Sequence, residues 1–377
     1  MITGPRRPRI ACVHLLDDFS GSAKVFSHAL SELKARGADV RIVVGSAGQS
    51  GFIRRDHAVD TFFYRFSEHR LLLLPLFALA QLLAFLKVLG LCLFWRADIV
   101  YANTLLNPGA LLAGRLCGRR VVVHAHEVGL GSKLLFTAVF ASARLLAHRF
   151  ICVSNYVRDA LRLDSSRAIV VYNSLPPAEW RKALEMAARR GPESGPFVVF
   201  MASSLKWYKG VGAFLDLARR AEASGAAIAR PLEFRLALNC SAGEWQAYTA
   251  GHEIPPALQV HLRPADIYEH YRDASLVLNL SDPLGWIETF GMTLLEAMAS
   301  GVPVVSPTVG GCVELFEQGD GGWRIPGSDL QRIEELIGEL SSNPATLQAA
   351  RERAADNARR FQPEAFASSL CAAVCGA

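Results

Sequence analysis

The chain has 377 residues, more than a single hydrophobic core usually organises, so two domains are expected. Hydrophobic residues make up 51% and charged residues 20%, which excludes an intrinsically disordered protein. The net charge of +5 is uneven, because residues 1–190 hold 26 Lys and Arg against 13 Asp and Glu, and residues 191–377 hold 14 against 22. The basic residues are dispersed without a nucleic-acid motif, so a membrane surface or a lipid-linked phosphate is the favoured anionic partner, rather than nucleic acid.

The eight cysteines are scattered, lie mostly in apolar segments and form no C-x-x-C pair. This pattern favours buried, reduced thiols over disulfides or metal ligands. No apolar stretch of signal-peptide length precedes the first predicted strand. We therefore expect a cytoplasmic protein.

The first half alternates strands and helices. An apolar run at 9–16 ends in Asp-Asp-Phe-Ser-Gly-Ser, and a helical pattern then leads to Arg36-Gly37 and a second strand at 39–44. This is a βαβ unit, which predicts a parallel, doubly wound sheet. Runs at 98–101, 120–125 and 149–153 continue the series, and 170–173 is the predicted last strand of this half.

Two long apolar segments interrupt this alternation. Residues 71–95 are long enough for a membrane span, but Pro75, Gln81 and Lys87 interrupt them. A spanning helix is disfavoured for that reason. Residues 133–149 form a second apolar helical pattern with basic residues at intervals. Both segments fit either ordinary core helices or helices that lie on an anionic membrane surface.

A change of composition separates the two halves. Pro176-Pro177, a polar helix and Gly191-Pro-Glu-Ser-Gly-Pro196 mark a linker. Strands are then predicted at 197–200, 234–238, 276–280 and 302–305, with helices between them. The sequence therefore predicts a first domain at 1–178, a linker at 179–196, a second Rossmann-like domain at 197–361 and a closing segment at 362–377.

The most informative segment is Ser281-Asp-Pro-Leu-Gly-Trp-Ile-Glu288-Thr-Phe-Gly-Met-Thr-Leu-Leu-Glu296. A loop that carries Glu288 and turns at Gly291 into a helix would direct free backbone N–H groups at an anion. Glu296 would lie just over one turn into the helix, where a carboxylate can accept hydrogen bonds from sugar hydroxyls. A Gly-x-Pro strand and a Gly310-Gly311 turn follow.

This segment resembles the E-x7-E signature of the retaining glycosyltransferases of family 4. The resemblance implies an α/β protein with the GT-B fold, in which two Rossmann-like doubly wound domains face each other across a cleft. It also implies that the last helix crosses back, so that 362–377 packs on the first domain. The implied function is transfer of a sugar, with retention of configuration, from a nucleotide sugar to a glycan or lipid-linked glycan acceptor.

The resemblance also assigns roles in the second domain. Glu288 would contact the donor sugar and Glu296 the nucleotide ribose, with the surrounding Thr289, Phe290, Gly291 and Met292 completing the donor site. Lys206-Trp-Tyr-Lys209-Gly resembles the family's Arg-x4-Lys-Gly motif, with Lys209 as its lysine. Ser204 stands where the arginine belongs, and Lys206 is the candidate replacement cation.

In the first domain the resemblance places His126 beside the donor sugar and phosphate, and His126, Lys209 and Glu288 are the catalytic candidates. Gly21 and Ser22 would form the small-residue loop that approaches the diphosphate or the acceptor. Asn103 and Asn173 end strands and are candidate acceptor contacts.

Several alternatives remain. The sequence has no Asp-x-Asp pair, zinc-type cluster, phosphate loop or dinucleotide fingerprint, so neither a metal nor another cofactor is expected. Other GT-B activities, such as a sugar-nucleotide epimerase or a phosphorylase, stay possible, as does a non-catalytic carbohydrate- or membrane-binding module. We expect a role in cell-surface polysaccharide or lipopolysaccharide synthesis, with peripheral association at the inner membrane face.

Overall fold

A computed structural model of the chain describes residues 7–48, 50–67, 69–191, 195–224, 230–251, 253–256 and 258–376, with backbone only at 70, 71, 223 and 224. The chain divides into two units. The first contains the residues up to Asn173 together with those from Glu364 onward, and the second is Ser174–Pro363.

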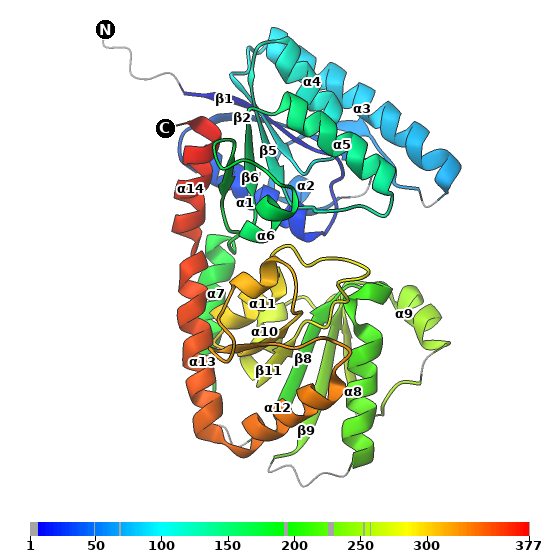
Figure 1. The fold of residues 1–377 in the computed structure, drawn as a ribbon, viewed down its shortest axis with the longest axis vertical. Helices are drawn as coiled ribbons and strands as arrows, with labels where there is room; N and C mark the ends of the chain where they lie inside the picture. Colours follow the sequence, from blue (N-terminus) through cyan, green and yellow to red (C-terminus); the bar gives the residue numbers. More distant parts are fainter. Residues whose placement is uncertain are drawn as a thin grey trace. The chain divides into compact units, whose positions relative to one another are not determined.

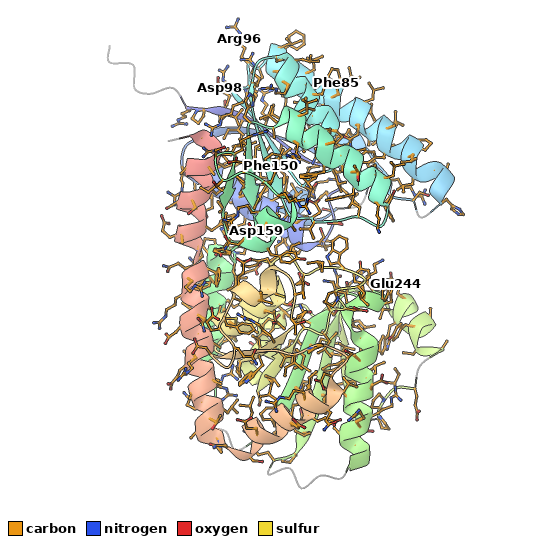
Figure 2. All side chains as sticks on the ribbon, viewed as in Figure 1. Phe85, Arg96, Asp98, Phe150, Asp159 and Glu244 are labelled. Atoms are coloured by element: carbon orange, nitrogen blue, oxygen red, sulfur yellow. The ribbon has the colours of Figure 1, made fainter. Side chains whose placement is uncertain are left out.

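The first unit contains a sheet of seven parallel strands in the order β3-β2-β1-β4-β5-β6-β7 (Figure 1). Helices cover both faces, and the central strands β1, β4 and β5 are therefore buried almost throughout instead of at alternate positions. Phe150 of β6, labelled in Figure 2, is fully buried in this core. The elements are β1 Arg9–His14, α1 Gly21–Ala35, β2 Asp39–Ser46, α2 Phe52–Asp56, β3 Asp60–Phe63, α3 Arg70–Leu93, β4 Ile99–Asn103, α4 Pro108–Leu116, β5 Arg120–Ala125, α5 Lys133–Leu146, β6 Arg149–Cys152, α6 Asn155–Ala160, β7 Ala168–Val170 and α14 Pro363–Cys375.

The second unit contains six parallel strands in the order β10-β9-β8-β11-β12-β13. Its core joins the central strands to the helices α8 and α12. The elements are α7 Pro177–Ala188, β8 Phe197–Ser203, η1 Trp207–Lys209, α8 Val211–Ser224, β9 Leu232–Leu238, α9 Ala242–Thr249, β10 Leu258–Leu262, α10 Ile267–Asp273, β11 Leu276–Leu278, α11 Met292–Ala299, β12 Val304–Ser306, η2 Gly311–Glu314, β13 Gly322–Arg324, α12 Leu330–Ser342, α13 Pro344–Ala358 and η3 Arg359–Phe361.

Both sheets reverse their strand order at one place. In the first unit the chain goes outward from β1 in one direction and resumes at β4 on the other side, and β8 and β11 repeat this arrangement in the second unit. Loops that leave the carboxyl ends of such strands diverge, which makes this edge the usual ligand site of doubly wound sheets. The switch points therefore define where functional side chains should be sought.

The predicted linker at 179–196 is wrong in its extent. Most of it is helix α7, which packs against α10 and α11 and belongs to the second unit. Residues 192–194 of that linker, and residues 1–6 before the first strand, lie outside the described residues. The segment from Glu364 is grouped with the first unit, where Phe366 stacks on His28 and Glu364 pairs with Arg36.

The strands differ from the prediction in detail. The last strand of the first unit is Ala168–Val170 instead of 170–173, and β3, β10 and β13 were not predicted. All three are at or near a sheet edge and have five residues or fewer, so they carry a weak apolar signal.

The apolar segment 71–95 forms one helix, α3, which includes Pro75. Over Leu72–Leu93 it is long and apolar enough to cross a membrane, yet in this structure one of its sides packs on the first unit. The buried stripe is spaced by three or four residues and consists of Phe77, Ala80, Ala84, Val88 and Cys92. Gln81 donates to the Leu106 carbonyl and accepts from the Gly109 N–H, and Lys87 pairs with Asp60.

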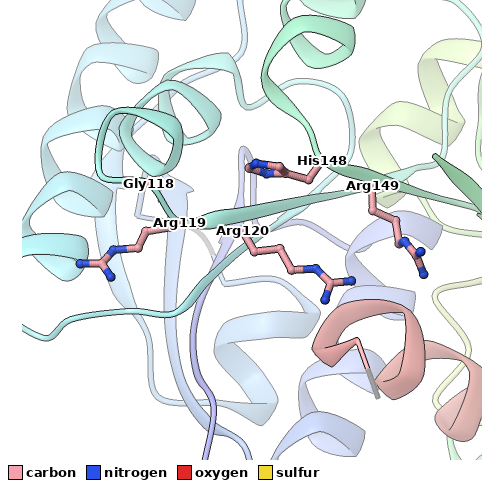
Figure 3. A pocket seen from close by; sticks show the side chains of 5 residues that line it. All are labelled: Gly118, Arg119, Arg120, His148 and Arg149. Carbon is pink, nitrogen blue, oxygen red and sulfur yellow. The ribbon is translucent and has the colours of Figure 1, made fainter. Parts of the chain in front are cut away.

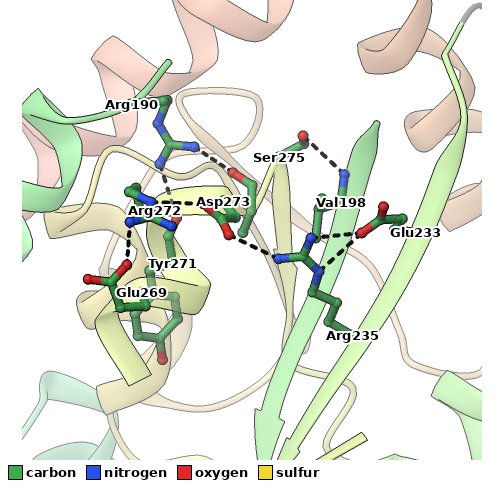
Figure 4. Close-up of polar contacts among 10 residues, drawn as sticks. Arg190, Val198, Glu233, Arg235, Glu269, Tyr271, Arg272, Asp273 and Ser275 are labelled. Atoms are coloured by element: carbon green, nitrogen blue, oxygen red, sulfur yellow. Dashed lines mark hydrogen bonds and ion pairs between the residues drawn. The ribbon is translucent and has the colours of Figure 1, made fainter. Parts of the chain in front are cut away.

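Arg190 fixes α7 to its neighbours in the second unit (Figure 4). Its guanidinium donates to the carbonyl oxygens of Ala274 at 2.6 Å, Tyr271 at 3.1 Å and Ser300 at 3.0 Å. These carbonyl groups lie at the C-terminal ends of helices α10 and α11. Backbone acceptors there have no partner within the helix, and a cation is favoured. Burial lowers the pKa of Arg190 to about 10, so the residue remains charged at neutral pH.

We predict that Arg190→Ala destabilises the second unit by about 2–4 kcal/mol, because it leaves buried carbonyl groups without donors. The neighbouring Arg189→Ala is the control, since Arg189 is exposed, and it should change stability by less than about 0.5 kcal/mol. Urea unfolding of the two variants measures both values. Equal stabilities would show that the guanidinium does not hold α7 in place.

Candidate functional site

In the second unit, an ion pair joins the loops that follow the two switch-point strands. Lys209 lies in η1 after β8, and Glu288 lies in the loop after β11. The Lys209 Nζ is 2.8 Å from the Glu288 Oε2, and the two side chains are 23% and 18% exposed. The pair is therefore sheltered but reachable, as a binding site for a polar ligand requires.

Two glycines shape these loops. Gly210 has a positive φ of 77°, and a Cβ there would lie 2.2 Å from the Leu280 carbonyl oxygen. Gly310, with φ of 119°, approaches the Glu288 carbonyl so closely that a Cβ would lie 2.3 Å from its oxygen. The Gly311 N–H donates to that same oxygen at 2.9 Å. The Gly-Gly turn thus holds the backbone of Glu288.

Helix α11 begins directly after this loop. Gly291 is its N-cap with a left-handed φ of 97°. The N–H groups of Met292 and Thr293 have no acceptor in the part of the chain that the structure describes. Free N–H groups at a helix start attract anions. Lys209 and this helix start therefore bring positive charge and donors to the Glu288 loop.

Glu296 and Phe290 lie deeper. The Glu296 carboxylate is 6% exposed and accepts a hydrogen bond of 2.9 Å from the Tyr271 hydroxyl of α10. Burial, with the Glu296 charge as the next cause, raises the pKa of Tyr271 well above its usual value, so the phenol stays a donor. Phe290 is 2% exposed and packs edge-on against Phe361, so its side chain is not available to a ligand. Thr289 and Met292 are half-buried.

Ser204 and Lys206 occupy the loop after β8. The Ser204 carbonyl accepts from the Lys206 N–H at 2.9 Å, which forms a tight turn. The Lys206 side chain is exposed. Its charge acts on Glu244: hydrogen bonds from Ser241 lower the pKa of Glu244, and the charges of Arg263 and Lys206 add to them. Lys209, not Lys206, is thus the cation that the structure pairs with Glu288.

In the first unit, the switch point holds a hydrogen-bond network centred on Asn103. Asn103 ends β4 beside His14 of β1. Its Nδ2 donates to the Ser22 carbonyl at 3.1 Å and to His14 Nδ1 at 3.1 Å. Its Oδ1 accepts from His126 Nε2 at 2.9 Å. Three predicted residues, Ser22, Asn103 and His126, therefore meet at one point, and His14 joins them.

The histidines of this network are neutral. Burial lowers the pKa of His126 well below its usual value, with His124 and His14 as lesser causes, and burial lowers the pKa of His124 to about 3. The Tyr101 hydroxyl is 2.7 Å from His124 Nδ1. Because His126 donates through Nε2, its neutral ring carries the proton there and leaves Nδ1 as an acceptor.

Glu127 is a buried acid that sequence reasoning passed over. It is 8% exposed, and its Oε2 accepts from the N–H groups of Leu105 and His126, each at 3.2 Å. Burial nevertheless raises its pKa to about 7. Thr104, with an unusual positive φ of 72°, begins the loop that Glu127 holds. The sequence did contain a signal for this residue, because Glu127 follows a predicted strand and is adjacent to His126, a predicted site residue.

The remaining predicted residues are placed as follows. Gly21 begins α1 with open space around its Cα and an ordinary φ, so an approach to its backbone is sterically free. Asn173, 4% exposed, follows β7, and its Oδ1 has no hydrogen-bond partner among the described residues. His126, Gly21, Ser22, Asn103 and Asn173 belong to the first unit, and the other predicted site residues belong to the second.

Comparison with known proteins agrees with this architecture. A family model described as glycosyl transferases group 1 matches residues 184–361, and one described as glycosyltransferase family 4 matches residues 19–179. D-inositol 3-phosphate glycosyltransferase 1 of Catenulispora acidiphila is 36% identical over 107 residues, which cover 27% of this chain and 25% of that protein. WcaL of Salmonella typhimurium, named for colanic acid biosynthesis, is 32% identical over 98 residues, 26% of this chain and 21% of that protein.

The matches to these relatives thus span a quarter of their length or less. Solved structures resemble the whole chain. Anabaena HepE in complex with UDP and glucose has a TM-score of 0.75 at 20% identity, covering 98% of this chain and 100% of that one. The lipopolysaccharide outer core galactosyltransferase WaaB has a TM-score of 0.68 at 15% identity, covering 98% and 99%. These likenesses establish the fold.

Glu127 should make stability depend on pH. Between pH 4.5 and about 7 the carboxyl is ionised in the unfolded chain but still protonated in the folded one, so folding takes up a proton and stability falls as pH rises. The free energy of unfolding of the natural protein should fall by up to about 3 kcal/mol between pH 5 and pH 8, at about 1.4 kcal/mol per pKa unit, when that of Glu127→Gln is taken as the reference. Urea unfolding at both pH values tests this; a stability difference that does not change with pH would contradict it.

Gly310→Ala should disturb the Glu288 loop. Its backbone conformation is almost restricted to glycine, and the added methyl collides with the Glu288 carbonyl, so we expect a loss of about 3 kcal/mol or more. Gly319 also has a positive φ but has open space, so Gly319→Ala should cost about 1–2 kcal/mol. Urea unfolding compares the two, and equal losses would show that the contact with Glu288 is unimportant.

Proposed function

The chain belongs to the group 1 glycosyltransferases of the GT-B fold, and from that premise we propose that it transfers a sugar from a nucleotide sugar to an acceptor hydroxyl. The observation that carries the proposal is the Lys209–Glu288 pair at the switch point of the second unit. A cation, a carboxylate and free helix N–H groups in one place suit a sugar joined to a diphosphate.

In the proposed reaction, the acceptor oxygen forms a bond to the anomeric carbon, and the bond from that carbon to the phosphate oxygen breaks. The nucleoside diphosphate leaves with the electron pair, and the acceptor proton passes to its phosphate oxygen. Lys209 and the N–H groups of Met292 and Thr293 stabilise the charge that develops on the diphosphate. Glu288 orients Lys209 and accepts from a donor-sugar hydroxyl.

We further propose that the sugar keeps its anomeric configuration, through attack on the same face from which the diphosphate departs. No side chain is assigned as a covalent nucleophile. His126 acts as a neutral group, because its lowered pKa prevents it from serving as a cation beside the phosphate. Its Nδ1 accepts a hydrogen bond from a sugar hydroxyl. Glu296 binds the ribose if the Tyr271 contact opens or is shared.

The donor and acceptor classes rest on the relatives. HepE was solved with UDP and with UDP-glucose, which supports a nucleoside diphosphate sugar as the donor. The names of WcaL and WaaB refer to colanic acid and lipopolysaccharide, which supports a glycan acceptor in surface-polysaccharide synthesis. We propose a lipid-linked acceptor, bound by the first unit at the cytoplasmic face of a membrane.

Two other functions make different predictions. A sugar-nucleotide epimerase would give no net release of nucleoside diphosphate, and a phosphorylase would release sugar phosphate. A non-catalytic binding module would bind the nucleotide sugar without turnover, and Ser204 in place of arginine favours it. Release of nucleoside diphosphate that increases with added acceptor separates transfer from all three.

Lys209→Met should lower the rate of nucleoside diphosphate release about 10²–10³-fold, because a preorganised charge at the leaving group is removed. Glu288→Gln should also lower it, through loss of the partner that orients Lys209. Lys182→Met is the matched control, since Lys182 lies on α7 and pairs with Asp266. It should retain the natural rate.

Because Lys209 and helix N–H groups supply the positive charge, we expect the rate to be unchanged in EDTA. Full activity of Lys209→Met would refute the role of this residue. Loss of activity in EDTA that Mg²⁺ or Mn²⁺ restores would refute the metal-independent mechanism while leaving sugar transfer intact.

A further inference from the structure

Three neighbouring helices of the first unit, α3, α4 and α5, carry an unusual number of exposed leucines. α4 packs against both α3 and α5, and the three lie together beside the sheet (Figure 1). We refer to their outward side as the α3–α5 face. Its leucines are each at least 42% exposed and are Leu72, Leu74, Leu79, Leu82, Leu86 and Leu93 of α3, Leu112 and Leu116 of α4, and Leu134 and Leu145 of α5.

The spacing on α3 shows that this exposure is organised. Leu72, Leu79, Leu86 and Leu93 are seven residues apart, so they follow one line along the helix. The opposite side of α3, formed by the buried residues from Phe77 to Cys92, is the side that packs on the first unit. An amphipathic surface helix would have polar residues on its outer side. The outer side of α3 is therefore suited to an apolar environment.

Charge on the same helices is of one sign. α3, α4 and α5, of 24, 9 and 14 residues, contain no Asp or Glu. They contain five basic residues, which are Arg70, Lys87, Arg115, Lys133 and Arg144. By contrast, α1, α2, α6 and α14 of the same unit each contain a carboxylate. The α3–α5 face is thus rich in leucine, and all charged residues of its three helices are basic.

A cationic cavity lies where these helices end (Figure 3). It measures about 440 Å³, and its lining residues are Gly118, which follows α4, Arg119, Arg120, His148, which follows α5, and Arg149. Arg119 also donates to the Cys92 carbonyl in the last turn of α3 at 3.0 Å. The cavity therefore adjoins the C-terminal ends of all three helices.

Among the described residues, the cavity arginines are not paired with carboxylates. In the second unit Arg235 pairs with both Glu233 and Asp273 (Figure 4). Arg119 and Arg120 donate only to backbone carbonyls, and within the described residues neither they nor Arg149 pair with a carboxylate. Burial and the charges of nearby arginines lower the pKa of His148, which indicates a positive potential here.

We propose that the α3–α5 face is the surface by which the protein binds an anionic phospholipid bilayer. The exposed leucines enter the interface between headgroups and acyl chains, and the exposed Lys133 and Arg144, with the cavity arginines, contact lipid phosphates. A second copy of the chain fits this surface poorly, because a symmetric contact would set the same cations against each other.

The helix lies on the bilayer and does not cross it. Crossing would require α3 to leave the first unit, expose its buried stripe and break the bonds of Gln81 and Lys87. The inference deepens the proposed function by identifying where a lipid-linked acceptor would be presented. Only the link to a lipid-linked acceptor rests on the proposed function, because lipid binding is measured without sugar transfer.

The test uses the full chain and vesicles of phosphatidylcholine, alone or with about one third phosphatidylglycerol. In a flotation assay the natural protein should bind the anionic vesicles at least tenfold more strongly than the neutral ones, and binding should weaken with salt. The double variant Leu82→Gln, Leu86→Gln and the double variant Lys133→Gln, Arg144→Gln should each bind the anionic vesicles at least tenfold less strongly.

Matched controls come from the second unit. Leu184→Gln removes a leucine that is 47% exposed on α7, and Arg220→Gln with Arg353→Gln removes two cations that pair with Glu334 and Asp320. Both should bind vesicles as the natural protein does. Thermal unfolding, alone and with UDP, GDP, ADP or dTDP, checks that every variant is folded and, independently of lipid, whether the donor site is present.

The inference is overturned if the natural protein does not bind anionic vesicles, or if both face variants bind as well as the controls. It is also overturned if gel filtration shows a dimer that Leu82→Gln, Leu86→Gln dissociates, because the face would then be a contact between copies. Nucleoside diphosphate binding without vesicle binding would refute this inference alone. Vesicle binding without binding of UDP, GDP, ADP or dTDP would refute the transferase proposal alone.

Discussion

The reversal of strand order in each parallel sheet is the constraint on which the sites depend. Where β1 meets β4, and where β8 meets β11, the following loops diverge and leave the carboxyl ends of two adjacent strands uncovered. Buried apolar strands hold these ends rigidly, so short loops can position polar groups within hydrogen-bond distance. Asn103 of β4 and the Lys209–Glu288 pair are both products of this geometry.

The two switch points differ in their electrostatics. The histidines at the switch point of the first unit, His14, His124 and His126, are buried, and burial lowers the pKa of each. The acidic residues near them are Asp17, Asp18 and Glu127, and burial raises the pKa of Glu127. In the second unit Lys209 and the start of α11 provide positive charge, which Glu288 partly balances. A diphosphate is therefore better matched to the second unit, and uncharged hydroxyl groups to the first.

The fold could be predicted from the sequence because long apolar strands alternate with helices. Glu288, Lys209 and His126 were selected as candidates because they lie in motifs that resemble those of the family. Sequence reasoning missed His14 and Glu127, since their importance comes from β1 lying beside β4 and from a loop folding back, which no local pattern encodes. It also predicted that Glu296 accepts hydrogen bonds from the ribose, and it did not foresee that packing of α11 against α10 buries the carboxylate against Tyr271. Short strands such as β13 were not predicted, because three residues are too few to show a periodic pattern.

The basic character of the first unit is not explained by its switch point. Acidic residues follow the carboxyl ends of β1 and β5, namely Asp17, Asp18 and Glu127, while β1, β5 and β6 each begin with an arginine. Five further cations lie on α3, α4 and α5, whose own sequences contain no Asp or Glu. A substrate phosphate bound at the carboxyl edge would gain little from charges at the opposite edge, because salt screens them over about 10 Å. The cations of α3, α4 and α5 and of the amino edge of the sheet therefore match the anionic bilayer that we propose as a partner better than they match the donor phosphate.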